Sequence, residues 1–222
     1  MKKIAIIIFG PPGAGKSTQA ELIAKKFNLI HFNTEKFLED ILFDPKRQQE
    51  EIIQREKKIF SEGKLLTPSF VVSEIKKILI RINKAGLGIV FSGSPRTLYE
   101  AQKIIPLLEK IYNKKNIIFF NLKIKEKDAC ERNSARLICK VCGYAFLSKY
   151  VPIKNPKYCP VCAGPFYKRV LDDPEKIKVR LLEYKNRTEP ILNFVKNKGF
   201  KIYDLDGEKP PYKIFEKISL II

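Results

Sequence analysis

The chain has 222 residues, of which 45% are hydrophobic, and a formal net charge of +19. This length and apolar content suit one α/β domain with inserted subdomains and argue against a disordered chain. No apolar run approaches the roughly 18 residues that a membrane helix needs, and the apolar start of the chain continues without a cleavage site, so we expect an unprocessed cytoplasmic protein. The basic excess is mostly lysine spread along the chain, which favours small anionic ligands over nucleic acid.

Apolar runs rich in β-branched residues alternate with helical patterns along the chain. The strands are expected at Ile4–Phe9, Leu29–Phe32, Gly88–Ser92, Asn116–Leu122 and Phe200–Leu205. The helices are expected at Lys16–Phe27, Lys46–Glu62, Pro68–Ala85, Leu98–Asn113, Glu126–Leu137, Asp173–Lys196 and Pro211–Ile218. This alternation predicts an α/β fold with a five-stranded parallel sheet that helices cover on both faces.

Two segments interrupt the alternation. Residues 33–63 hold two helical stretches broken at Asp44-Pro45, and residues near 138–168 are rich in Pro, Gly and Cys. Both occupy positions where a lid or a binding arm is inserted into a core. We therefore expect a core made of residues 1–32, 64–131 and 170–222, a helical insertion at 33–63 and a lid at 132–169.

A glycine-rich motif joins the first expected strand to the first expected helix. It reads G-P-P-G-A-G-K-S-T, which is the P-loop pattern in its usual context. Glycines let the backbone wrap around phosphate oxygens, and the amides that open the helix point at the anion. The motif predicts a P-loop NTPase-like three-layer core in which Lys16 reaches the outer phosphates and Ser17 ligates Mg²⁺. The expected ATP-binding residues are Gly10, Pro11, Pro12, Gly13, Ala14, Gly15, Lys16, Ser17 and Thr18.

Four cysteines form two C-x-x-C pairs, Cys139 with Cys142 and Cys159 with Cys162. This paired spacing is typical of a tetrahedral four-thiolate zinc site. Protein would fill all four ligand positions, so the Zn²⁺ is expected to stabilise a loop with little core of its own and not to activate water. Iron stays open as an alternative, since thiolates bind both metals. Cys130 lies outside the pairs and is interpreted as a small core residue.

The P-loop, the late zinc ribbon and Ser92-Gly93-Ser94-Pro95-Arg96-Thr97 together resemble the adenylate kinase family in its zinc-containing long-lid form. Further matches are Gly63-Lys64-Leu65-Leu66-Thr67, like the end of the family's acceptor arm, and Leu205-Asp206-Gly207-Glu208-Lys209-Pro210, like its adenine-loop segment. The resemblance covers almost the whole chain. It implies that residues 33–63 bind a nucleoside monophosphate and that the lid closes over ATP.

The resemblance also assigns roles to individual residues. Phosphoryl transfer needs fixed cations around many negative oxygens, and arginine forks suit that task. The implied catalytic residues are Lys16, Arg96, Arg132, Arg136, Arg169 and Arg180, with Arg132, Arg136 and Lys209 also binding ATP. The implied acceptor-binding residues are Thr34, Glu39, Leu65, Thr67, Gly93, Arg96 and Glu100.

Departures from the family cluster on the acceptor side. Glu39 replaces a phosphate-binding arginine and would repel the acceptor unless Lys36, Arg47 or Arg55 compensates. Glu100 replaces the glutamine that reads adenine. An ionised carboxylate only accepts hydrogen bonds, so this change points to guanine, to loosened base specificity or to ordinary helix-start chemistry.

Two further positions bear on the chemistry. Ser92 replaces an aspartate that orders the Mg²⁺ shell, and Ser94 replaces an aromatic residue beside the acceptor. Lone His31 is interpreted as structural. No catalytic base is evident, and none is needed because the acceptor phosphate is already an anionic nucleophile.

The resulting hypothesis is a monomeric, Mg²⁺-dependent nucleoside monophosphate kinase, with ATP as donor and AMP as the acceptor that the resemblance implies. A kinase for another monophosphate such as GMP stays open. The rival hypothesis is a P-loop ATPase whose zinc ribbon and basic surface bind RNA or a ribosomal partner.

Overall fold

The computed structural model describes residues 3–151, 153 and 156–222. Five strands form one parallel sheet in the order β2-β3-β1-β4-β8, which confirms the expected fold class. All five residues of β1 are buried, as a sheet covered on both faces requires. The strands are β1 Ala5–Phe9, β2 Ile30–Phe32, β3 Ile89–Ser92, β4 Ile117–Lys123 and β8 Ile202–Asp206.

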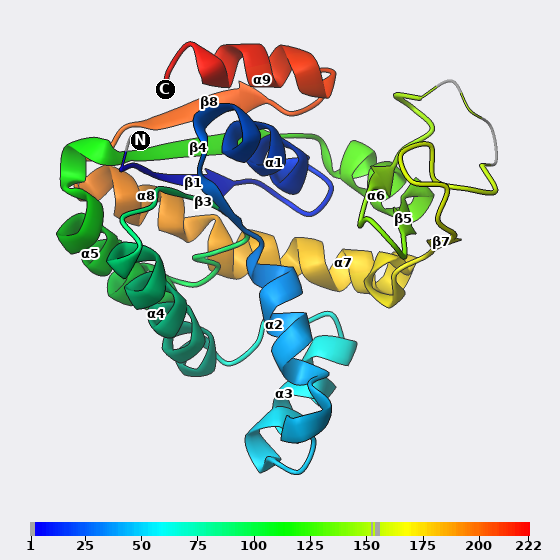
Figure 1. Cartoon of the computed structure of the whole chain (residues 1–222), viewed down its shortest axis with the longest axis horizontal. Coiled ribbons are helices and arrows are strands. Elements are labelled where there is room, and N and C mark those ends of the chain that lie inside the picture. The colour runs from blue at the N-terminus through cyan, green and yellow to red at the C-terminus, as the bar shows by residue number, and fades with distance from the viewer. Residues whose placement is uncertain (1–2, 152, 154–155) are drawn as a thin grey trace.

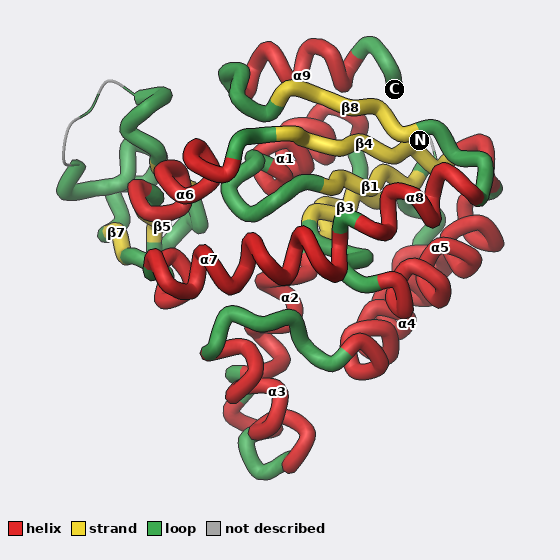
Figure 2. The backbone as a smooth tube through the Cα atoms, turned by 180° about the vertical axis from the view of Figure 1, so that it is seen from behind, coloured by secondary structure: helices red, strands yellow, loops and turns green. Residues whose placement is uncertain are grey.

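Helices cover both faces of the sheet and make two separate cores (Figures 1 and 2). Alternate residues of β1 point to opposite faces: Ile7 joins the core under α4, α5 and α8, whereas Ile6 joins the core under α1 and α9. The layers are therefore helix, sheet and helix. The covering helices are α1 Lys16–Phe27, α4 Pro68–Lys84, α5 Leu98–Tyr112, α8 Pro190–Asn197 and α9 Pro211–Ser219.

A helical arm projects away from the sheet (Figures 1 and 2). It consists of α2 Thr34–Leu42, a 3-10 turn at Pro45–Arg47, and α3 Glu51–Ser61. The expected helix at Lys46–Glu62 is wrong at its start. Proline at the first position of the 3-10 turn, capped by Asp44, makes a separate tight turn, and Gln48 then bonds back to the carbonyl of Leu42.

A second, small antiparallel sheet lies at the end of α6 Glu126–Ala135, on the side of the molecule away from α5 (Figure 1). Its order is β6-β5-β7, with β5 Leu137–Cys139, β6 Ala145–Phe146 and β7 Phe166–Tyr167. The helix expected to reach Leu137 ends earlier, because Arg136 is extended and β5 begins there.

The long helix expected at Asp173–Lys196 is interrupted. It comprises α7 Pro174–Glu183, a π-helical turn at Tyr184–Thr188, and then α8. Pro190 has no N–H to continue the α-helical ladder, and the N–H of Glu189 instead donates to the carbonyl of Tyr184 at 2.9 Å. Within the turn, the Thr188 hydroxyl donates to the Arg96 carbonyl at 2.8 Å, which ties this helix to the loop after β3.

The remaining 3-10 turns are Lys114–Asn116 and Val170–Asp172. Within the part of the chain that the structure describes, no helix has the length and apolar character needed to cross a membrane.

Candidate nucleotide site

The main pocket opens at the carboxyl ends of β1 and β3. Its walls come from the loop after β1, the start of α2, the segment 63–66, the loop after β3, the end of α6, and α7. Parallel pairing sets Ile8 beside Ser92, so the loops that follow these two strands meet at one edge of the sheet. This edge is the usual ligand position in an open α/β sheet.

The loop after β1 needs glycine for two physical reasons. Gly13 has a φ of 82°, and a Cβ there would lie 2.6 Å from Asn133 Nδ2 and 2.9 Å from the Ala129 carbonyl oxygen. A side chain would therefore be strained and would also push α6 away. The loop and the helix that leads into the small sheet consequently lie in direct contact.

Lys16 folds back over this loop. Its Nζ donates to the carbonyl oxygens of Gly10 and Pro11, each at 2.8 Å. Burial, together with the charges of Arg96 and Arg180, lowers the pKa of Lys16 to about 7. A nearby anion would raise that pKa again and hold the lysine in its charged form.

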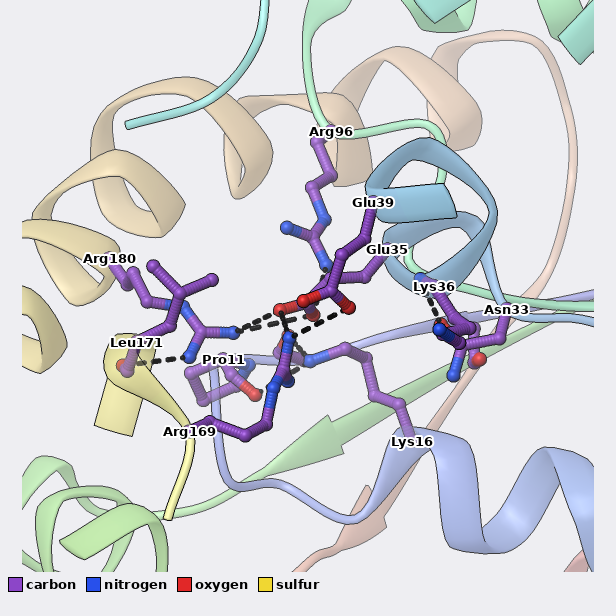
Figure 3. A network of polar contacts seen from close by, with 12 residues as sticks. Pro11, Lys16, Asn33, Glu35, Lys36, Glu39, Arg96, Arg169, Leu171 and Arg180 are labelled. Atoms are coloured by element: carbon purple, nitrogen blue, oxygen red, sulfur yellow. Dashed lines mark hydrogen bonds and ion pairs between the residues drawn. The ribbon is translucent and has the colours of Figure 1, made fainter. Parts of the chain in front are cut away.

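Three arginines from different segments converge on one carboxylate, that of Glu35 in the first turn of α2 (Figure 3). Glu35 lies 2.8 Å from Arg169 Nη2, 3.2 Å from Arg180 Nη2 and 3.4 Å from Arg96 Nη2. Burial alone would raise the pKa of Glu35, but Arg180, Arg169 and Arg96 hold it well below its usual range. The carboxylate is therefore ionised, and it links the arm to the core and to the end of the lid segment.

The two arginines at the end of α6 have different partners. Arg136 makes a bidentate pair with the buried Asp172, at 2.6 and 3.0 Å. Arg132 is buried and donates to the Gly207 carbonyl at 2.7 Å and to the Tyr150 hydroxyl at 2.6 Å. Arg132 thus joins the small-sheet segment to the turn after β8.

The side of the pocket formed by α2 and the loop after β3 contains two buried hydroxyls, Thr34 Oγ1 and Ser94 Oγ, which have no hydrogen-bond partner among the described residues. Glu100 is also buried there. Its carboxylate accepts from the Arg96 backbone N–H at 2.8 Å and from the Thr97 hydroxyl at 3.0 Å, and this caps α5. Burial raises the pKa of Glu100, although these two hydrogen bonds oppose the shift.

The four paired cysteines gather at one point of the small sheet. Their sulfur atoms lie within 4.8 Å of one another, with Cys139 Sγ 3.4 Å from Cys162 Sγ and Cys142 Sγ 3.6 Å from Cys159 Sγ. A tetrahedral metal with bonds of about 2.3 Å sets sulfurs about 3.8 Å apart, so the cluster is compatible with zinc. Gly164 is required beside it, because a Cβ there would lie 3.0 Å from Cys139 Sγ.

Comparison with known proteins identifies the family. The family model described as adenylate kinase matches residues 8–200. The chain belongs to the adenylate kinase family. A protein named adenylate kinase from Caldicellulosiruptor saccharolyticus is 34% identical over 92% of both chains. Proteins of the same name from Methanothrix thermoacetophila and Elusimicrobium minutum are 33% and 32% identical over 98% of this chain and 97% of theirs. The protein is accordingly a phosphotransferase of the nucleoside monophosphate kinase class.

The pocket brings together most of the site residues that the family resemblance implies: Gly10, Pro12, Gly13, Gly15, Lys16, Ser17, Thr18, Thr34, Leu65, Gly93, Arg96, Glu100, Arg132, Arg136 and Arg180. Pro11, Ala14, Glu39, Thr67, Arg169 and Lys209 are not among its lining residues. Ala14 is packed in the core beneath the loop, and Lys209 is exposed on the turn after β8, 3.8 Å from Asp206.

The cation beside Glu39 is not one of the three residues considered as compensating it. Lys36, Arg47 and Arg55 form ion pairs with Asp40, Glu50 and Glu56 instead. The cation near Glu39 is Arg169, whose Nη2 lies 3.8 Å from Glu39 Oε2. Lys36 lies on the same helix but turns toward Asp40, one helical turn away.

Three acidic residues of the site were missed by the sequence reasoning: Glu35, Asp172 and Glu56. Glu56 is fully buried in α3 and accepts from the Thr67 N–H at 2.8 Å, so it fastens the arm to the core. Glu35 had a usable signal, because it follows the matched Thr34 in the same segment as Glu39. Asp172 and Glu56 lie in ordinary charged stretches, where the sequence carries no sign of burial.

Proposed function

We propose that this protein transfers the γ-phosphoryl group of ATP to AMP and so forms two molecules of ADP. The observation that carries this proposal is the convergence of Arg96, Arg169 and Arg180 between the P-loop and the first turn of α2. Fixed guanidinium groups at that position suit the charge on a phosphoryl group moving between two nucleotides. The acceptor phosphate is itself an anionic nucleophile, so the proposed reaction needs no general base.

The proposed division of labour follows the elements. The P-loop and Lys16 would hold the ATP phosphates, and Arg132 and Arg136 would lie along them from α6. Residues 33–63 would form the acceptor-binding insertion, and residues 132–169 the lid on a core of residues 1–32, 64–131 and 170–222. Lid closure would exclude water, so that the phosphoryl group passes to the acceptor and is not hydrolysed.

Magnesium would be held at Ser17, whose exposed hydroxyl lines the pocket beside Lys16 and offers the hard oxygen ligand that Mg²⁺ prefers. The ion would neutralise phosphate charge and orient the γ-phosphate. Ser92 offers no carboxylate to the Mg²⁺ shell, and its hydroxyl pairs with His31 Nε2 at 2.7 Å. We infer that ATP phosphates and water supply most of the remaining ligands.

Zinc is the metal we propose for Cys139, Cys142, Cys159 and Cys162. The backbone N–H groups of Val141 and Val161 each donate to a sulfur at 3.4 Å, an arrangement that stabilises thiolates. With four sulfur ligands the ion would have a structural role only. The cysteines form no disulfide, which suits a reducing compartment, and we propose a cytoplasmic enzyme. We also propose that it acts as a monomer, because one chain supplies all the pocket residues named above.

Adenine is favoured over guanine as the acceptor base. Each oxygen of the Glu100 carboxylate already accepts a local hydrogen bond, from the Arg96 N–H and from the Thr97 hydroxyl, which leaves fewer lone pairs for the two adjacent donors of guanine. The capping role therefore accounts for Glu100 without a guanine. The rival RNA-binding hypothesis explains neither the arginine cluster nor the family match.

A coupled assay with ATP and Mg²⁺ against AMP, GMP, CMP, UMP and their deoxy forms tests this proposal. We expect the highest kcat/KM with AMP. Arg96→Ala should lower phosphoryl transfer by about a hundredfold or more while ATP affinity stays within a few fold. Arg81→Ala, on the exposed face of α4, is the matched control and should be silent. If no monophosphate yields a diphosphate, the proposal fails.

A further inference from the structure

Glu35 is the only carboxylate in the described chain that three arginines approach within 3.4 Å. The arginines come from the loop after β3, from the residue before the 3-10 turn at Val170–Asp172, and from α7 (Figure 3). The segments that carry Arg169 and Arg180 follow one another in the sequence, whereas Arg96 and Glu35 come from distant parts of the chain. The tertiary fold therefore builds one anion site, and a side chain of the acceptor arm fills it.

The charges at this site do not balance. With Arg136 paired to Asp172, which also lies 3.6 Å from Arg180, and with Glu39 3.8 Å from Arg169, four arginines face three carboxylates, so one positive charge stays in excess around Arg96, Arg169 and Arg180. Their side chains are only 28%, 15% and 10% exposed, so water screens this excess weakly. A phosphate has more oxygens and more charge than a carboxylate, and guanidinium forks match its geometry. The site is therefore better suited to a phosphate than to the glutamate that occupies it.

The surroundings of Glu35 also point to a polar ligand. Thr34 Oγ1, on the adjacent residue, is buried in the same pocket with no partner among the described residues, and so is Ser94 Oγ. A buried hydroxyl without a partner costs free energy that a ligand oxygen would recover. Among the described residues, the hydrogen bonds to the Glu35 carboxylate come from these arginines, and neither hydroxyl donates to it.

We propose that Glu35 is an internal ligand of the acceptor's anion site: its carboxylate occupies the arginine cluster that the acceptor phosphate must enter, so Glu35 sets the acceptor's affinity. The inference rests on the proposed function for the identity of the incoming phosphate. Binding is an exchange of one anion for another. Only the molecules in which Glu35 has left the arginines can bind the acceptor phosphate. The apparent affinity for the acceptor therefore falls as the fraction of such molecules falls.

The test compares Glu35→Gln with Asp40→Asn. Both residues lie on α2, and the Asp40 carboxylate pairs with Lys36 at 2.6 Å on the exposed side of the helix. The first measurement is calorimetric binding of inorganic phosphate with the P-loop saturated by a non-hydrolysable ATP analogue, so that phosphate reports on the acceptor side alone. Glu35→Gln should bind phosphate about tenfold more tightly than the wild type, and Asp40→Asn should change the affinity for phosphate by less than about threefold.

The second measurement is steady-state phosphoryl transfer. Glu35→Gln should lower the acceptor KM about tenfold and leave the ATP KM within a factor of about two. Glu35→Asp keeps the charge but has a shorter reach, and should give an intermediate acceptor KM. This variant also serves if Glu35→Gln does not fold, since an acceptor KM equal to that of the wild type would then overturn the proposal.

The outcomes separate the two proposals. If phosphate binds Glu35→Gln no more tightly than the wild type while transfer to AMP proceeds, the internal-ligand proposal fails and the proposed function stands. If phosphate binding tightens but no monophosphate is phosphorylated, the anion exchange stands and the proposed function fails.

Discussion

Asp172 offers the sharpest test of how the lid segment is fastened to the core. Its side chain is 1% exposed, accepts two hydrogen bonds from Arg136 and lies 3.6 Å from Arg180 Nη1. In Asp172→Asn the amide oxygen keeps one of the two bonds, but its NH₂ faces a guanidinium group that only donates. Arg136 then loses its counter-charge, and Arg180 keeps only that of Glu35; both side chains are partly buried.

The expected cost is about 3 kcal/mol, the lower end of the range for breaking a buried ion pair, because Arg136 is 21% exposed and retains one bond. For a chain of this size each kcal/mol lowers Tm by roughly 2–4 °C, so Tm should fall by about 6–12 °C. Thermal unfolding followed by calorimetry measures the shift.

Asp40→Asn is the matched control. It removes the same charge from an ion pair whose side chains are 61% and 64% exposed, and should cost less than about 1 kcal/mol. If Asp172→Asn and Asp40→Asn lower Tm equally, burial of the Arg136 pair does not stabilise the fold as argued.

Two further predictions concern metal and protons. Chelation should remove about one zinc per chain and make residues near the small sheet sensitive to protease. Cys142→Ser should have the same effect, whereas the control Cys130→Ser should not. A metal-free chain with a protease-resistant lid would contradict the zinc site. Because the pKa of Lys16 is lowered to about 7, most free protein at pH 8 lacks this proton, and ATP phosphates should restore it. Calorimetry in buffers of different ionisation enthalpy should therefore detect proton uptake on ATP binding at pH 8, absent in Lys16→Arg, and a buffer-independent heat would refute the assignment.

Local sequence patterns predicted the core well because strand formation and loop geometry depend mainly on neighbouring residues. Apolar β-branched runs located all five strands of the main sheet within two residues, and the glycine spacing of Gly10–Thr18 located the phosphate loop. The helix errors had local causes that were misjudged. Proline has no backbone N–H, so it interrupts an α-helix. One expected helix began directly after Pro45, and another continued through Pro190.

The glycine and cysteine spacing of this chain predicted a P-loop core and a four-cysteine cluster, and the family resemblance assigned a set of arginines to a phosphoryl-transfer site. Only the tertiary structure decided how those arginines are neutralised. Glu35 is 61 residues from Arg96, 134 from Arg169 and 145 from Arg180, and Asp172 is 36 from Arg136. An ion pair depends on distance and burial in space, and neither has a periodicity that a sequence can display.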